Sequence, residues 1–118
     1  MLSVVIGNAA TDAHAYRGWF IGHFVPPELG LRHTPDVEVK WGIHPFGETR
    51  AEWGTSAAAT SMSLLVRGAI RFYFADGLET LLDEPGDYAV WAPGVAHRWR
   101  IEDDKTVVLT VRWPSEGG

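Results

Sequence analysis

Residues 86–97 read GDYAVWAPGVAH, and this stretch decides the fold class. An apolar run at 88–91 is followed by Pro93 and Gly94 and then by His97. A short apolar run bounded by Gly, Asp and Pro is typical of a β-strand, and the Pro-Gly pair is typical of a tight turn. We therefore expect a strand that ends in a rigid turn, with His97 placed just beyond it.

The same pattern of short apolar runs continues on both sides of this stretch. The 118 residues include 13 glycines, 7 prolines and 6 tryptophans. This punctuation predicts an all-β sandwich or barrel in one domain, residues 1–118, with its core over about 19–113. Residues 51–60 are expected to form a loop. The expected strands are Trp19–Val25, Val37–His44, Ser61–Phe74, Leu78–Leu82, Tyr88–Trp91, His97–Ile101 and Thr106–Trp113.

The composition narrows the classes of function. Fifteen acidic and ten basic residues give a net charge of −5. The basic residues occur singly, from Arg17 through Lys40 to Arg112, so we expect no nucleic-acid partner. Without cysteine the chain has neither disulfides nor thiolate metal ligands. No apolar run approaches the ~20 residues of a membrane span, and residues 1–8 do not resemble a signal peptide, so we expect a cytoplasmic protein with no membrane partner.

Alternation along residues 37–44 separates two faces of the expected strand. One face is apolar and we interpret it as core: Val37, Val39, Trp41 and Ile43. The other face borders either solvent or a wet cavity, which alternation does not distinguish: Glu38, Lys40, Gly42 and His44. By the same alternation His97 shares a face with Trp99 and Ile101, so we predict that His97 points inward.

The expected strand over residues 61–74 is apolar on both sides near its start. Met62 and Leu64 lie on one side, and Leu65 lies on the other. A strand that is apolar on both faces needs a cover on the outside of the barrel, because exposed apolar surface promotes aggregation. A second copy of the chain is the simplest cover, and we predict a homodimer.

The stretch at 86–97 resembles the second sequence motif of the cupin superfamily. That motif consists of glycine, five residues, proline, one residue, glycine, two residues, histidine, three residues and asparagine. Gly86, Gly94 and His97 match its spacing, whereas alanine and isoleucine stand at the proline and asparagine positions. The resemblance covers roughly residues 37–113 and implies a double-stranded β-helix, the jelly-roll barrel of the cupins. It also implies a dimer.

The first cupin motif carries two histidines and a glutamate between two glycines, and these complete the usual four metal ligands. Gly47 and Gly68 can serve as the two glycines. Trp53 and Thr55 stand at the histidine positions, and Ser61 stands at the glutamate position. The resemblance therefore implies a barrel in which the histidine of the second motif is kept and the metal site is degraded.

Aromatic and hydroxyl side chains occupy the positions that the two motifs assign to the barrel interior. Small-molecule sites combine apolar walls with a few polar groups, and tryptophan offers a large apolar area. The predicted ligand pocket therefore consists of His97, Trp99, Trp53, Thr55, Ser61 and Ser63.

A divalent metal is the alternative cofactor. Metal sites in proteins use three or four ligands, and imidazole and carboxylate suit Zn, Fe, Ni or Mn. A site that includes His97 needs further ligands, and the nearest candidates in the sequence are His44, Glu48 and Glu52. These residues alone decide neither whether a metal binds nor whether the chain is an enzyme.

Three functions remain open at this point. The first is a small-molecule-binding protein with an aromatic-lined barrel pocket around His97 and a degraded metal site. The second is a metal-dependent cupin enzyme of the isomerase, lyase or dioxygenase type that uses His97 and His44 with a non-standard ligand set. The third is a barrel that acts through its oligomeric surface. The missing ligands of the first motif favour the first function over the second, and the tryptophans near the pocket argue against the third.

Overall fold

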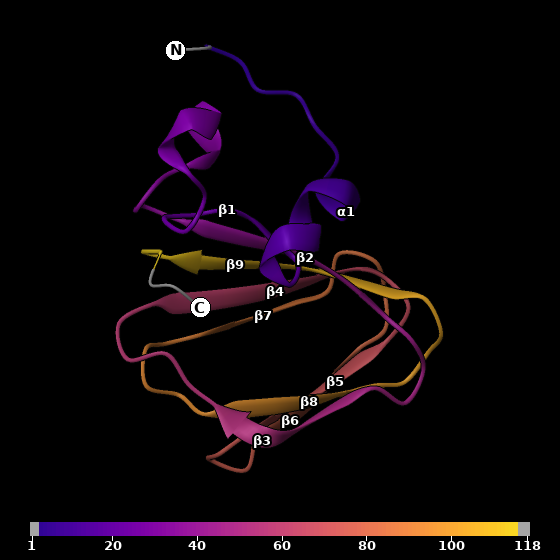
Figure 1. Cartoon of the computed structure of the whole chain (residues 1–118). Coiled ribbons are helices and arrows are strands. Elements are labelled where there is room, and N and C mark those ends of the chain that lie inside the picture. The colour runs from indigo at the N-terminus through magenta and orange to yellow at the C-terminus, as the bar shows by residue number, and fades with distance from the viewer. Residues whose placement is uncertain (1–2, 116–118) are drawn as a thin grey trace.

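The computed structural model describes residues 3–115, which form two antiparallel sheets that face each other (Figure 1). The strands are β1 Trp19–Ile21, β2 Glu38–His44, β3 Thr49–Gly54, β4 Thr60–Arg67, β5 Ile70–Phe74, β6 Glu79–Leu82, β7 Tyr88–Trp91, β8 His97–Ile101 and β9 Thr106–Trp113. Three short helices are α1 Ala9–Asp12, η1 Ala13–Tyr16 and η2 Pro27–Arg32. One sheet has the order β1-β2-β9-β4-β7 and the other the order β3-β8-β5-β6. The all-β class is confirmed, and within 3–115 no helix has the length and hydropathy needed to span a bilayer.

The predicted strand bounds hold best in the second half of the chain. β7, β8 and β9 have the expected limits, whereas β1 ends early at Ile21 and β6 begins one residue late at Glu79. The loop expected over residues 51–60 is wrong at its start, because β3 occupies Thr49–Gly54. β3 is an edge strand with five exposed residues before the buried Gly54, so it lacks the alternation of buried and exposed residues that identifies a strand.

The single strand expected over residues 61–74 is two strands in different sheets. β4 belongs to the first sheet and β5 to the second, and Gly68 lies in the turn between them with φ of 90°. A positive φ is the conformation that glycine adopts without steric cost, so the turn forms at this residue. The homodimer inferred from the long strand stays a prediction.

The two faces of β2 are the reverse of the expected arrangement. Glu38 is fully buried, and Lys40 and His44 line a cavity between the sheets. On the opposite face Ile43 is 58% exposed, and α1 packs against the strand from outside (Figure 1). The interpretation of the apolar face as core is therefore wrong, and the polar face lines the barrel interior.

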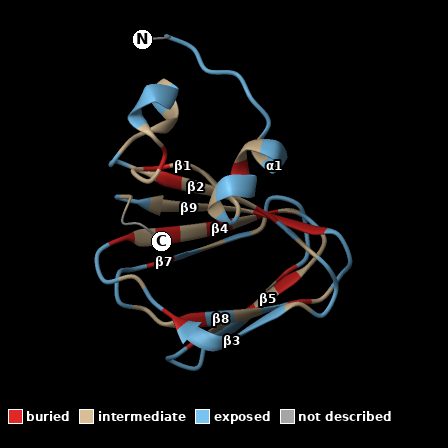
Figure 2. Ribbon diagram, in the orientation of Figure 1, coloured by how far each residue is buried: buried red, intermediate tan, exposed pale blue. Residues whose placement is uncertain are grey.

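Buried residues occur in both sheets (Figure 2), and the apolar core combines side chains from the two. Phe72 on β5 is the largest fully buried side chain, and its ring centroid lies 6.1 Å from that of Phe74 and 5.5 Å from that of Trp91. Burying a side chain of this size contributes about 1.5–3 kcal/mol. The other buried members of the core are Leu65, Ile70, Leu82, Ile101 and Val108. This packing fixes the strands that carry the site.

Candidate functional site

His97 begins β8 and lies where the packed core gives way to a cavity. The residue is 8% exposed, and its ring centroid lies 4.7 Å from that of Trp91 and 6.5 Å from that of Phe72. A cavity of about 50 Å³ adjoins it between the sheets. The polar side chains in the wall of this cavity are Lys40, His44, Arg50, Ser63, Thr110 and Arg112.

The surroundings of His97 keep its imidazole neutral. Its pKa is lowered from 6.5 to about 4, mainly by burial and then by the positive charges of Arg50 and Arg112. The backbone of Gly54 and Val95 acts in the opposite direction and more weakly. Nδ1 of His97 is buried and has no hydrogen-bond partner in the described part of the chain. At neutral pH this residue therefore offers a ligand an uncharged hydrogen-bonding group.

The lowered pKa of His97 predicts a loss of stability in acid. The unfolded chain binds a proton on this side chain below pH 6.5, whereas the folded chain binds it only near pH 4. Stability therefore falls as the pH is lowered through this window. The contribution of His97 to the free energy of unfolding is about 2 kcal/mol smaller at pH 5 than at pH 7. Urea unfolding should show that the wild type loses about 2 kcal/mol more than His97→Gln between these two pH values. Equal losses in the two proteins would contradict the shift.

A second cavity, of about 260 Å³, also borders His97. Thr55 and Ser61, which were predicted as pocket residues, line it together with His97. Two residues that the sequence did not single out line it as well, Arg50 and Arg112. The structure thus brings together three of the four positions at which the motifs place metal ligands, and adds two guanidinium groups to them.

The two arginines reach this cavity from distant parts of the chain. Arg112 on β9 lies beside Ser61 on β4 and Glu38 on β2 in the register of the first sheet. Its Nη1 is 3.5 Å from Oε1 of Glu38. Arg50 on β3 extends over Gly54, where a Cβ atom would lie 2.5 Å from Cζ of the guanidinium. Glycine at this position therefore leaves the space that Arg50 occupies.

Of the remaining predicted pocket residues, Ser63 and Trp99 line the 50 Å³ cavity and Trp53 lies elsewhere. Ser63 is buried, and its hydroxyl pairs with the hydroxyl of Thr110 at 2.9 Å. Trp99 lines the 50 Å³ cavity, with its ring centroid 5.0 Å from that of His44. Trp53 is 48% exposed and lies 4.9 Å from Cζ of Arg98, measured to the ring centroid. Because Arg98 points away from the face of β8 that carries His97, the structure places Trp53 outside the barrel.

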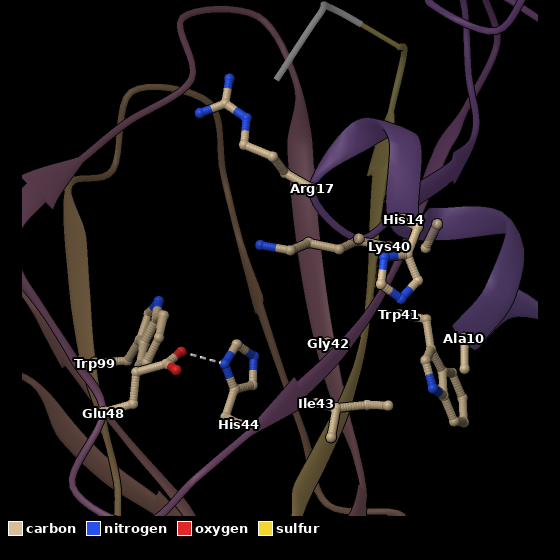
Figure 3. Close-up of a pocket in the computed structure, with 12 residues that line it drawn as sticks. Ala10, His14, Arg17, Lys40, Trp41, Gly42, Ile43, His44, Glu48 and Trp99 are labelled. Carbon is tan, nitrogen blue, oxygen red and sulfur yellow. Dashed lines mark hydrogen bonds and ion pairs between the residues drawn. The ribbon is translucent and has the colours of Figure 1, made fainter.

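The alternative metal ligands form a pair rather than a metal centre. Nδ1 of His44 is hydrogen-bonded to Oε1 of Glu48, and both line a cavity of about 450 Å³ whose wall includes residues of β2, α1 and η1 (Figure 3). Glu52 is exposed on β3. Within residues 3–115, no three His, Asp or Glu side chains are grouped so that they could hold a metal ion.

Comparison with known proteins identifies the architecture. No sequence-family profile and no curated protein matches the chain by sequence. Among solved structures, KdgF from a Halomonas species superimposes with a TM-score of 0.65 at 20% identity, over 73% of this chain and 77% of that one. A cupin protein from Bacteroides fragilis superimposes with a TM-score of 0.61 at 15% identity, over 69% of this chain and 68% of that one. The chain has the cupin fold.

A third solved structure shares this cupin fold. It is an uncharacterized Klebsiella pneumoniae protein with a double-stranded β-helix domain, which matches with a TM-score of 0.63 at 21% identity over 72% of this chain and 73% of that one. These superpositions, at such low sequence identities, show the architecture alone. They confirm the double-stranded β-helix that the motif at 86–97 predicted.

The glycine framework of the cupin motifs is kept, whereas His97 alone is kept of their four metal ligands. The four motif glycines have positive φ angles, at Gly47, Gly68, Gly86 and Gly94. Around His97 the cavity wall offers three hydroxyl residues and two cations: Thr55, Ser56, Ser61, Arg50 and Arg112. Neutral hydroxyls are weak ligands, and guanidinium groups repel a divalent cation. The residues present therefore do not fit the metal that this fold implies.

Proposed function

We propose that this chain binds a small organic molecule in its barrel and holds it with side chains rather than through a resident metal ion. The observation that carries the proposal is the 260 Å³ cavity in which His97, Thr55 and Ser61 lie together with two arginines. Polar groups of several kinds converge there, and the neighbouring 50 Å³ cavity adds Trp91 and Trp99 to the wall. A concave site with aromatic walls and a few convergent polar groups is the usual form of a small-molecule site.

The His44–Glu48 pair favours a second candidate function, an enzyme that transfers protons. A carboxylate that accepts the hydrogen bond of Nδ1–H leaves Nε2 of the imidazole as the acceptor, which is the arrangement of a general base. His44 lines the same 50 Å³ cavity as His97. This candidate shares the ligand site of the first proposal and adds a chemical step to it.

The proposed function is tested by screening small organic molecules against EDTA-treated protein with thermal unfolding as the readout. A molecule present at ten times its Kd should raise the free energy of unfolding by about 1.4 kcal/mol. Thr55→Phe should abolish the effect, because Thr55 is exposed at the cavity wall and a phenyl ring there fills the space. Ala58→Phe should keep the effect, since Ala58 is exposed in the same segment and does not line that cavity.

Two results of this screen would count against the proposal. One is that no compound stabilises the EDTA-treated wild type, and the other is that every stabilising compound acts equally on Thr55→Phe. Mass spectrometry of each binder after incubation distinguishes the two candidate functions. An unchanged compound supports a binding protein, and a converted compound supports the enzyme.

A further inference from the structure

Basic side chains gather at the mouth of the barrel. Arg17, Lys40, Arg50 and Arg112 line one cavity of about 550 Å³, in which Glu38 is the acidic residue of the wall. Three of these cations, all but Arg17, also line the 50 Å³ cavity beside His97. The chain as a whole carries a net charge of −5, so the fold rather than the composition concentrates positive charge here.

These cations outnumber the carboxylate that faces them. Glu38 is fully buried, and its Oε1 lies 3.5 Å from Nη1 of Arg112. Its Oε2 accepts a hydrogen bond from the Ser115 hydroxyl at 3.3 Å. The side chains of Lys40 and Arg50 make no hydrogen bond or ion pair in the described part of the chain. Two positive charges therefore face the cavity without an ion-pair partner among residues 3–115.

The crowding of like charges is costly to the folded chain. Nζ of Lys40 and Cζ of Arg112 lie 5.7 Å and 4.7 Å from the centroid of the same ring, that of Trp19. The pKa of Lys40 is lowered, first by burial and then by Arg112 and Arg50. An anion bound among these groups would offset their repulsion. The cluster is thus suited to a negatively charged ligand.

The wall next to the cations is apolar and aromatic, which matches an organic anion rather than an inorganic one. A planar guanidinium binds a carboxylate through two parallel hydrogen bonds. Arg50 lies over Gly54, which is the register partner of His97 in the second sheet. From His97 the wall continues through Trp91 and Trp99. A ligand that reaches from Arg50 to these rings has a charged end and an apolar body.

We propose that the ligand of this barrel is a small organic carboxylate. Its carboxylate lies between Arg50 and Arg112 with Lys40 beside them, and its apolar body lies against the aromatic wall around His97. This inference rests on the proposed function, because it names the class of molecule that the same cavity binds. The guanidinium groups then supply the positive charge that a metal ion supplies where the motif ligands are complete.

The inference is tested by calorimetric titration with carboxylic acids and their primary amides, beginning with benzoate and benzamide. Each pair has nearly the same shape and differs in charge. We expect the acid to bind about 10- to 100-fold more tightly than the amide, as hydrogen bonds to charged groups predict. Inorganic phosphate should bind more weakly than benzoate, because it has no apolar body to place against the tryptophans.

Variants that each remove one positive charge identify the residues responsible for the preference for acid over amide. Arg112→Gln and Arg50→Gln should each reduce the preference for acid over amide by about tenfold or more. Arg98→Gln removes the same charge from the outer side of β8 and should leave the preference unchanged. The comparison of acid with amide on the wild type does not depend on how any variant folds.

The outcomes separate the two proposals. If neither member of any pair binds to the wild type, the proposed function fails. If amides bind as tightly as their acids, or if phosphate binds as tightly as benzoate, the cavity binds ligands but the carboxylate inference is overturned. The inference is also overturned if Arg112→Gln and Arg50→Gln behave like Arg98→Gln.

Discussion

Replacing Gly68 by alanine should lower the free energy of unfolding by about 3–5 kcal/mol. Gly68 has φ of 90°, a conformation that is strained for alanine. A Cβ atom there would also lie 2.7 Å from the backbone Cα and 2.3 Å from the side-chain Oγ1 of Thr106. Because Thr106 is fully buried, it has little room to move away. Backbone strain and a steric clash therefore add at this one position.

The displacement of Thr106 would also break hydrogen bonds at this corner of the barrel. Its hydroxyl accepts a bond from the backbone N–H of Ala69 at 3.2 Å and donates one to the carbonyl of Asp103 at 2.8 Å. These bonds hold the turn between β4 and β5 against the start of β9. The substitution thus loosens the point at which the chain crosses from one sheet to the other.

Gly77→Ala is the matched control for this prediction. Gly77 has φ of 95°, close to that of Gly68, but a Cβ atom there meets nothing within 4 Å. Only the backbone strain of about 1–2 kcal/mol should remain. Urea unfolding of both variants measures the difference. Equal losses in Gly68→Ala and Gly77→Ala would show that the contact with Thr106 is not the cause.

The fold follows from local patterns that a single sequence displays. Tyr88–Trp91 and His97–Ile101 are apolar or alternating runs bounded by Gly and Pro, so their limits could be predicted. β3 could not, because an edge strand with five exposed residues has no buried face to produce a pattern. The break at Gly68 was missed because apolar residues continue on both sides of it.

The faces of β2 show where periodicity stops being informative. Periodicity correctly places Lys40 and Trp41 on opposite faces of the strand, but it assigns the apolar face to the core. In this barrel the polar face of β2 lines an internal cavity, and α1 packs against the other face. Sequence alone does not reveal such a cavity.

Part of the candidate site could be predicted from the sequence. His97, Thr55 and Ser61 could be found because the motif spacing places them in, or just beyond, strands that converge. Arg50 and Arg112 stand 62 positions apart, and only the register of the two sheets brings both to His97. Their isolation along the chain gave no reason to connect them. Trp53 was misplaced because β3 pairs Arg50 and Gly54 with the inward residues Trp99 and His97, and by alternation Trp53 belongs to the other face.

The chemistry of the cavity wall predicts that the purified protein carries far less than one metal ion per chain. A divalent ion needs three or four donor ligands, and the cavity at His97 supplies one imidazole and three hydroxyls, which are weak ligands when neutral. Arg50 and Arg112 add positive charge beside that imidazole, which opposes the entry of a cation. The pair formed by His44 and Glu48 is two ligands, too few for tight binding.

Elemental analysis tests the central claim that the site is built without a metal. The protein is expressed with Zn, Fe, Ni and Mn in the medium and purified without chelators. His97→Ala reports on the cavity, and His33→Ala is its control, because His33 is hydrogen-bonded to the carbonyl of Val25 outside the site. The account predicts far less than one equivalent of any metal in the wild type and in both variants. One equivalent in the wild type and in His33→Ala, lost from His97→Ala, would contradict it.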